Sequence, residues 1–477
     1  MGSVNYKKVN KHDIIMKILY YNWTPLHVQR VGGGVAVYLE NLITSLATTG
    51  GDITVLTSGY YYDNSSSLYI KKDVDETLCK SYTLVNSPAP APLGIVSPKV
   101  LQKIMADTQC KDLIYNFIKE HGPFDVIHFQ TLEGISPNVL SLKEEFPHTR
   151  FIHSIHDYGL FCPNVKFWNA RDENCVTVGT KENCRACMLS AESLPLSHYL
   201  SDRNRKRSKL YNFFFQKIWG INRKLRKCFI SKAAIDRYNS IYQAYRSFCV
   251  EKINKYIDVE LAVSKRVKDI ASIYGIKSEK IKVSYIGTKV AEKALGHSNS
   301  LFDGESLTLL FMGYADKVKG FDFLVDALRD VNPDISSKVV LKFASKITPL
   351  GKAKLDSLKD KYKDIILFNG YTHSDLPEIC KNVNIGVVPP MWEDNLPQVT
   401  IEMVANGIPV ITSNNGGAKE LNSHPSFVFS SKIDFISKFE TIYKNPSLLD
   451  DYWNYSAKLT TMDEHINHLK EIYSLCK

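Results

Sequence analysis

Short apolar segments that alternate with helix-patterned segments constrain the fold of this chain more than any other feature. Each apolar segment is four to eight residues long. Between them, apolar residues recur at spacings of three and four, as in 35–46. The segments lie at 14–21, 53–57, 125–129, 151–156, 261–264, 282–286, 307–312, 339–343, 365–368, 385–388 and 409–412. Such brief apolar strands between helices indicate parallel sheets that helices cover on both faces.

The length of the chain favours two such sheets. A single hydrophobic core stops growing at about 250–300 residues, and this chain has 477. We predict an α/β protein with two Rossmann-like, doubly wound lobes that face each other across a cleft. The first lobe is expected over 16–290, with an irregular insertion over about 162–256. The second is expected over 291–455, followed by a C-terminal helix over 456–477 that returns to the first lobe.

Composition favours a cytoplasmic protein. No run of about twenty apolar residues is present, so no transmembrane helix is predicted. The polar residues 1–13 do not have the pattern of a signal peptide. Ten cysteines in a chain without such a signal indicate reduced thiols rather than a disulfide framework.

Positive charge is concentrated in residues 203–232. This segment carries eleven Lys and Arg residues and no acid, whereas the whole chain has a net charge of +10. Aromatic residues such as Phe213 and Trp219 lie among the cations. A helix of this composition can lie on an anionic membrane, which predicts peripheral binding to the inner face of the plasma membrane. A solvated helix packed on the first lobe is the alternative, and a nucleic-acid partner is not expected, because nothing else in the chain supports it.

The candidate chemistry lies just beyond predicted strands, where doubly wound sheets bind ligands. After the strand at 385–388, Asp394 falls in a loop and Glu402 follows on a predicted helix. A carboxylate can accept two hydrogen bonds from a vicinal diol. The backbone amides of Asn395 and Leu396 precede the helix, where they can meet hydroxyls or a phosphate. Taken alone, the two acids fit a surface helix better than a site, and only the whole block favours the site.

The whole block, 392–411, resembles the signature of retaining glycosyltransferases of family 4. In that signature an acid, seven residues and a Glu precede a Gly-x-Pro-Val strand, and the pair Gly416-Gly417 matches the loop that follows. The resemblance covers nearly the whole chain outside the insertion. It implies the GT-B fold, a nucleotide-diphosphate sugar as donor, and transfer with retention to a glycan or lipid-linked acceptor. The similarity is to bacterial members that act in cell-surface polysaccharide biosynthesis.

The resemblance also implies roles for individual residues. His156 and Asp394 would contact the donor sugar and Lys319 its diphosphate, which makes these three the candidate catalytic residues. Glu402 would bind the ribose hydroxyls. The other donor-binding residues that the resemblance implies are Gly33, Gly34, Gly313, Tyr314, Gly370, Tyr371, Asn395 and Leu396. Taken singly, His156 fits a core histidine as well, the glycines a plain turn, and Lys319 a solvated charge.

Two positions depart from the family pattern. Asp394 stands where Glu is usual, with Glu393 beside it. We assign the role to Asp394, since only it keeps the seven-residue gap to Glu402. Tyr314 stands where members often carry an Arg that contacts the diphosphate, and tyrosine cannot supply that charge. Lys319 must then carry it, together with helix N-termini or Lys317.

We expect a hexosyltransferase that works without a metal ion or another catalytic cofactor. No Asp-x-Asp pair stands in a metal-binding context, so Lys319 and the amides of Gly32–Gly34 would hold the leaving diphosphate by positioning and charge. Two other classes remain open. A sugar-nucleotide epimerase of the same fold would bind the donor but need no acceptor. A catalytically inactive pair of lobes would bind membrane or RNA through 203–232.

Four cysteines within the insertion raise a separate hypothesis. They are Cys162, Cys175, Cys184 and Cys187, of which the last two form Cys-x-x-Cys. Four thiolates can close a tetrahedral zinc site and order a segment that has little core of its own. A structural zinc ion is therefore one hypothesis, and four reduced cysteines are the other.

Overall fold

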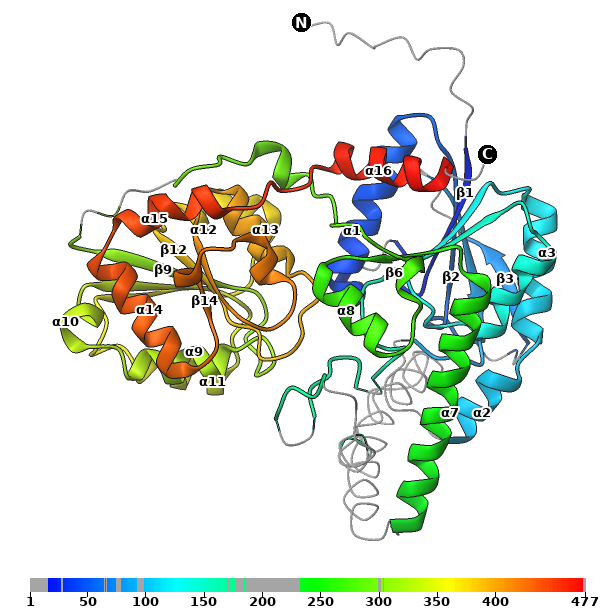
Figure 1. The fold of residues 1–477 in the computed structure, drawn as a ribbon, viewed down its shortest axis with the longest axis horizontal. Coiled ribbons are helices and arrows are strands. Elements are labelled where there is room, and N and C mark those ends of the chain that lie inside the picture. Colours follow the sequence, from blue (N-terminus) through cyan, green and yellow to red (C-terminus); the bar gives the residue numbers. More distant parts are fainter. Residues whose placement is uncertain are drawn as a thin grey trace, which may run out of the picture.

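The two predicted lobes are present, each built on one sheet (Figure 1). The structure is a computed structural model that describes residues 16–26, 29–63, 65, 67–73, 79–91, 98–162, 164–169, 172–176, 184, 187, 232–298, 302 and 304–474. The basic segment lies outside these residues except for Lys232. The predicted two-lobed α/β fold is confirmed.

The first lobe contains an eight-stranded sheet in the order β3-β4-β2-β1-β5-β6-β7-β8. Its strands are β1 (Lys17–Asn22), β2 (Asp52–Ser58), β3 (Tyr69–Lys72), β4 (Lys80–Val85), β5 (Val126–Phe129), β6 (Arg150–Ile155), β7 (Val259–Ala262) and β8 (Ile281–Val283). Of these described strands, only β3 pairs antiparallel, at the edge of the sheet. Strands β5 and β6 are buried along their whole length, because helices cover both faces of a parallel sheet.

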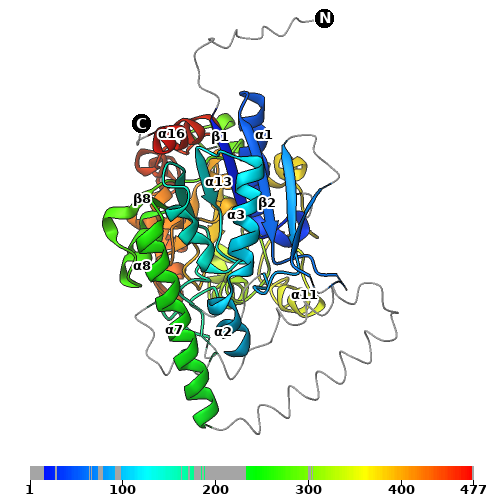
Figure 2. The same cartoon turned by 90° about the vertical axis from the view of Figure 1, so that its right-hand side faces the viewer.

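Helices cover this sheet on both sides. The elements are α1 (Gln29–Thr48), α2 (Pro98–Ala106), α3 (Gln109–His121), η1 (Pro137–Glu144), α7 (Lys232–Tyr256), α8 (Lys265–Ile273) and η2 (Ser278–Lys280). The short helix η3 (Val290–Lys293) follows and packs against the second lobe. Helix α7 packs against α2 and η1 and buries Cys249 and Ile253 (Figure 2). The last part of the predicted insertion is therefore a helix of the first lobe's outer layer.

The second lobe contains a six-stranded, fully parallel sheet in the order β11-β10-β9-β12-β13-β14. Its strands are β9 (Leu307–Met312), β10 (Val339–Ala344), β11 (Asp364–Phe368), β12 (Ile385–Val388), β13 (Val410–Ser413) and β14 (Val428–Phe429). Its helices are α9 (Phe321–Arg329), α10 (Pro333–Ser336), α11 (Pro349–Asp356), η4 (His373–Asp375), α12 (Leu376–Cys380), α13 (Gln398–Ala405), η5 (Ala418–Leu421), η6 (Pro425–Phe427), α14 (Lys432–Lys444), α15 (Ser447–Asp451) and η7 (Tyr452–Tyr455).

The C-terminal helix α16 (Met462–Ser474) lies against α1 of the first lobe, as the red helix in Figure 1 shows. The hydroxyl of Tyr38 in α1 lies 2.7 Å from His465 Nε2. The hydroxyl of Tyr473 lies 2.9 Å from that of Tyr20 and 2.7 Å from His128 Nδ1, so buried polar contacts fix the helix on the sheet. The chain thus crosses back from the second lobe and ties the two lobes together.

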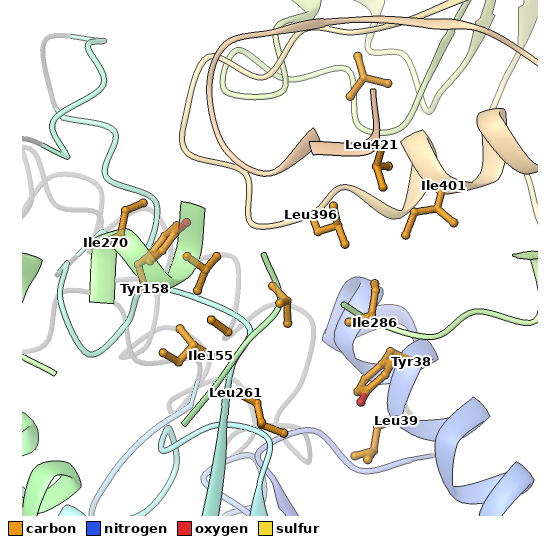
Figure 3. Close-up of a cluster of buried hydrophobic side chains, with 14 of the residues drawn as sticks. Tyr38, Leu39, Ile155, Tyr158, Leu261, Ile270, Ile286, Leu396, Ile401 and Leu421 are labelled. Atoms are coloured by element: carbon orange, nitrogen blue, oxygen red, sulfur yellow. The ribbon is translucent and has the colours of Figure 1, made fainter. Parts of the chain in front are cut away.

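Apolar side chains of both lobes meet where the lobes adjoin. Figure 3 shows Leu396 and Ile401 of the second lobe above Ile286 and Tyr38 of the first. These residues belong to one buried cluster that runs through both lobes. Among the helices that the structure describes, none has the length and apolar character needed to span a membrane.

Candidate functional site

The predicted acids lie on the segment that leaves strand β12. Helix α13 packs very close to this strand, because a Cβ on Gly386 would lie only 2.4 Å from Met403 Sδ. The loop between strand and helix carries Asp394, and α13 itself carries Glu402. Both residues are buried, with 6% and 7% of their surface exposed. Two carboxylates are therefore held beyond the carboxyl end of the sheet, as predicted.

The loop after β9 brings Lys319 to Asp394. Gly320 caps α9 with φ of +82°, and a Cβ there would lie 1.8 Å from Pro389 O, so this loop lies directly against the end of β12. Lys319 Nζ is 2.5 Å from Asp394 Oδ2 and 5.1 Å from the centre of the Trp392 ring. A cation is thus fixed between a buried carboxylate and an aromatic face. The sequence prediction gave Trp392 no role, although an aromatic residue just beyond a strand is a usable signal.

Glu402 lies in a second group of side chains. Its Oε1 is 3.1 Å from His373 Nε2, whereas its buried Oε2 has no hydrogen-bond partner among the described residues. The hydrogen bond to Glu402 raises the pKa of His373, and burial raises the pKa of Tyr371, with Glu402 adding to the shift. The turn that brings Tyr371 here uses Gly370 at φ of +84°. His373 was not predicted from the sequence, because it carries no motif of its own.

Tyr314 extends the group around Tyr371. It follows Gly313, whose φ is +114°, at the end of β9, and 65% of its surface is exposed. It lies close enough to Tyr371 to contribute to the raised pKa of that residue. Among the described residues, Tyr314 forms no hydrogen bond or cation–π contact with Lys319. It therefore does not help to position the Lys319 ammonium group.

His156 approaches the site from the first lobe, just after β6. Its Nε2 is 2.8 Å from Gln130 Oε1, and its backbone carbonyl accepts a hydrogen bond from Asn395 Nδ2 of the second lobe. Burial, with His153 and His465 nearby, lowers the pKa of His156 to about 3. Its imidazole is therefore neutral near pH 7 and able to hydrogen-bond a neutral hydroxyl.

The glycine triplet does not form the predicted loop. Helix α1 begins at Gln29, so Gly33 and Gly34 lie within the helix, and the structure corrects the loop expected at 30–34. In an α-helix starting there, the amides of both glycines lie beyond the first four positions, whose N–H groups lack intrahelical partners. The carbonyl of Gly34 accepts a hydrogen bond from Gln398 Nε2 of α13 at 2.9 Å. The glycines thus contribute an interlobe contact.

The two neighbouring acids have different partners. The Glu393 carboxylate forms an ion pair with Arg266 of the first lobe at 2.8 Å. Asp394 instead pairs with Lys319. Glu393 therefore joins the two lobes, whereas Asp394 joins two loops of the second lobe.

The four cysteines of the insertion are free thiols. Burial raises the pKa of Cys162 and of Cys175 to about 12, and other cysteines of the group add to both shifts. Within the described ranges, no group of three or more His, Cys, Asp or Glu is arranged to hold a metal ion. The structural zinc ion stays a prediction.

The second lobe matches a family of known sequences, and the chain resembles solved structures in its fold. Residues 293–459 match the sequence model of the family Glycosyl transferases group 1. An uncharacterized glycosyltransferase of Methanocaldococcus jannaschii is 26% identical over 176 residues, which cover 34% of this chain and 44% of the relative. Spore coat protein SA of Bacillus subtilis is 25% identical over 202 residues, covering 39% and 52%. The chain thus spans about half the length of these curated relatives.

The fold resembles solved two-lobed structures. HepE of Anabaena in complex with UDP has a TM-score of 0.55 at 13% identity, over 96% of this chain and 100% of that chain. At this identity the likeness shows the fold alone, which is GT-B. The comparisons thus show a match to Glycosyl transferases group 1 over residues 293–459 and a GT-B fold for the chain.

Proposed function

We propose that the protein is a metal-independent, retaining glycosyltransferase that takes a hexosyl group from a nucleotide-diphosphate sugar. The observation that best supports this proposal is the burial of Asp394 and Glu402, a few residues apart, at the junction of the two lobes. Lys319 of the same lobe and His156 of the first lobe are held beside this loop. The family match of residues 293–459 supports donor binding by the second lobe, and HepE, of the same fold, binds UDP.

The geometry suits the departure of a diphosphate. Charge develops on the leaving phosphates as the sugar carbon becomes cationic, and a preorganised cation stabilises that charge. Lys319 can serve the phosphates while it holds Asp394, because its ammonium group has three N–H donors and uses one on that carboxylate. The first turn of α13 carries no acid and adds backbone donors at the same place.

The orphaned polar atoms suit a hydroxylated ligand. Glu402 Oε2, Asn395 Oδ1 and Trp392 Nε1 are all buried without a hydrogen-bond partner among the described residues. Leaving such atoms unpaired costs free energy, so a ligand that pairs them gains affinity. The two oxygens accept hydrogen bonds from sugar or ribose hydroxyls, and the indole N–H donates to a hydroxyl or phosphate oxygen.

The remaining features of the proposal concern the acceptor. The acceptor is a glycan or lipid-linked saccharide in cell-surface polysaccharide biosynthesis, and it approaches from the first lobe. A water-sized pocket there is lined by His156, Asp157 and Glu133, so polar groups lie close to the predicted position of the acceptor. Residues 203–232 would hold the enzyme at an anionic membrane surface, close to a lipid-linked acceptor.

A thermal-shift screen of nucleotide sugars tests the proposal. A donor that binds only the folded protein raises its melting temperature, and a hundredfold excess over Kd stabilises it by about 2.7 kcal/mol. The selected donor is then incubated with saccharide acceptors, with and without a strong chelator, and the anomeric configuration of the product is determined. An epimerase would alter the donor with no acceptor present. Absence of any shift across the donor set, or activity restored only by added magnesium or manganese, would contradict the proposal.

A further inference from the structure

We propose that Arg266 of the first lobe is a positioning residue for the donor loop of the second lobe, acting through Glu393. The inference rests on the proposed function, because the loop in question carries Asp394. It assigns to the first lobe a further part in shaping the donor site, beside the hydrogen bond that the His156 carbonyl accepts from Asn395.

The contact between Arg266 and Glu393 is bidentate. Arg266 Nε donates to Glu393 Oε2 at 2.8 Å, and Nη2 donates to Oε1 at 2.9 Å. Asn174 Nδ2 and the backbone N–H of Gly416 donate to the same carboxylate at 2.9 and 3.0 Å. Burial alone would raise the pKa of Glu393, but the hydrogen bonds from Arg266 and Asn174 lower it overall. Four donors from three parts of the chain fix both the position and the orientation of this carboxylate.

A second carboxylate, that of Glu420, holds the start of α8, the helix that carries Arg266. Glu420 of the second lobe accepts the backbone N–H groups of Lys265 and Arg266 at 2.9 and 2.8 Å, and the hydroxyl of Tyr285 at 2.8 Å. Ser264 caps the next free N–H, that of Val267, at 3.2 Å. The first N–H groups of a helix have no intrahelical partner, and a carboxylate there is favoured by the helix dipole. The first turn of α8 is therefore capped in part by the other lobe, which sets where Arg266 stands.

The pair Gly416-Gly417 lies between the start of α8 and Asp394, and so links the position of the helix to that of Asp394. The Gly417 N–H donates to Asp394 O at 2.8 Å. A Cβ on Gly417 would lie 2.2 Å from Asn395 O and 2.8 Å from Ser264 Cβ, so the loop is packed between its own lobe and the start of α8. A Cβ on Gly416, at φ of +72°, would lie 2.0 Å from Asp394 O. Asp394 is thus held on two sides. Glu393, next to it in the sequence, is fixed by Arg266, and the loop with Gly416 and Gly417 packs against its backbone.

A purely structural ion pair would give a different result from a positioning residue. If Arg266 only joined the lobes, its loss would lower stability but leave the donor kinetics of the folded enzyme unchanged. If it sets the loop, its loss leaves Glu393 buried without its cation, and the Asp394–Lys319 pair shifts. The donor site should then be weakened while the acceptor side is not.

Steady-state kinetics of Arg266→Gln test this difference. We expect the donor KM to rise at least tenfold, with the acceptor KM changed less than twofold. Lys268→Gln is the matched control, because it removes the same charge from the same helix, and the Lys268 side chain forms no hydrogen bond or ion pair with the described residues of the second lobe. It should stay within twofold of wild type. Arg266→Lys keeps the charge but not the bidentate fork, so its donor KM should lie between those of wild type and Arg266→Gln. This variant also tests the proposal if Arg266→Gln does not fold.

Amide hydrogen exchange supplies a readout that needs no turnover. Peptides covering 413–420 should exchange faster in Arg266→Gln than in wild type or Lys268→Gln. If wild type transfers no sugar, the proposed function fails while this exchange still tests the role of Arg266. Unchanged donor KM in the Arg266 variants, or exchange of 413–420 equal to that of the control, would overturn the positioning role.

Discussion

Replacing Glu402 by Gln separates ligand binding from folding, because its two carboxylate oxygens have unequal surroundings. One oxygen meets His373 at 3.1 Å, and the other is buried without a partner among the described residues. Glu402→Gln keeps the shape of the side chain and removes the charge. In the folded protein this removes an ion pair to an exposed histidine, which is worth little. It also removes the cost of burying an unpaired carboxylate oxygen.

The expected loss lies in the affinity for the ligand. A hydrogen bond to a charged group contributes about 1.5–3 kcal/mol. Because about 1.4 kcal/mol corresponds to a tenfold change in affinity, losing one such bond to a ribose hydroxyl should weaken binding by roughly 10- to 150-fold. The melting temperature should stay the same or rise. The pKa of His373, which the hydrogen bond to Glu402 raises, should fall back toward its ordinary value.

Calorimetric titration gives the affinities. The ligands are the nucleoside diphosphate of the selected donor and its 2′,3′-dideoxy counterpart. Wild type should bind the ribose form roughly 10- to 150-fold more tightly than the dideoxy form. Glu402→Gln should bind the two forms about equally. Glu378→Gln is the control, since this exposed acid on α12 carries the same charge change. Equal preference for the ribose form in wild type and Glu402→Gln would refute the placement of Glu402 at the ribose.

Three further predictions follow from the site, the core and the charge distribution. Lys319→Ala should weaken binding of the nucleoside diphosphate at least tenfold and of the bare nucleoside less than twofold, measured by calorimetry; equal losses would remove Lys319 from the phosphates. Burial lowers the pKa of His465 to about 4, so the unfolded chain binds the extra proton first, and this group should contribute about 2 kcal/mol to the loss of stability as pH drops from about 7.5 to about 5, beside the contributions of His128 and His156. His465→Gln should reduce that slope in urea unfolding, and an unchanged slope would contradict the assignment. Replacing the five cations from Arg203 to Lys209 by Ser should release the protein from anionic vesicles at low salt, each cation contributing about 1 kcal/mol, while wild type that ignores such vesicles would end the membrane proposal.

Local pattern was sufficient to place five strands of the second lobe, whereas the two-residue strand β14 was missed. The expected strand 307–312 coincides with β9, and the expected strand 385–388 with β12. Continuous burial on both faces leaves an apolar run that is visible without any partner. Strands β3 and β4 were missed because β3 is an edge strand with exposed lysines and lacks such a run.

The sequence also located Asp394, Glu402 and Lys319 as candidates, because ligands of parallel sheets bind just beyond strand ends. It could not place the glycine triplet correctly. Glycine favours a loop by intrinsic preference, yet α1 begins at Gln29 and includes Gly33 and Gly34. Helix packing in the first lobe outweighed that preference, since tertiary contacts commonly override propensities of about 1 kcal/mol.

Only the tertiary structure decided which residues face one another across the lobes. The sequence determined that two acids stand side by side, but not that Glu393 pairs with Arg266 while Asp394 pairs with Lys319. Arg266 and Glu393 are 127 positions apart, and Gln398 and Gly34 are 364 apart. Periodicity records the burial of a residue within its own helix or strand, over a few positions. The partner of a buried charge is set by how the two lobes dock. The distance between the two paired residues is then fixed by the packing of whole sheets and helices.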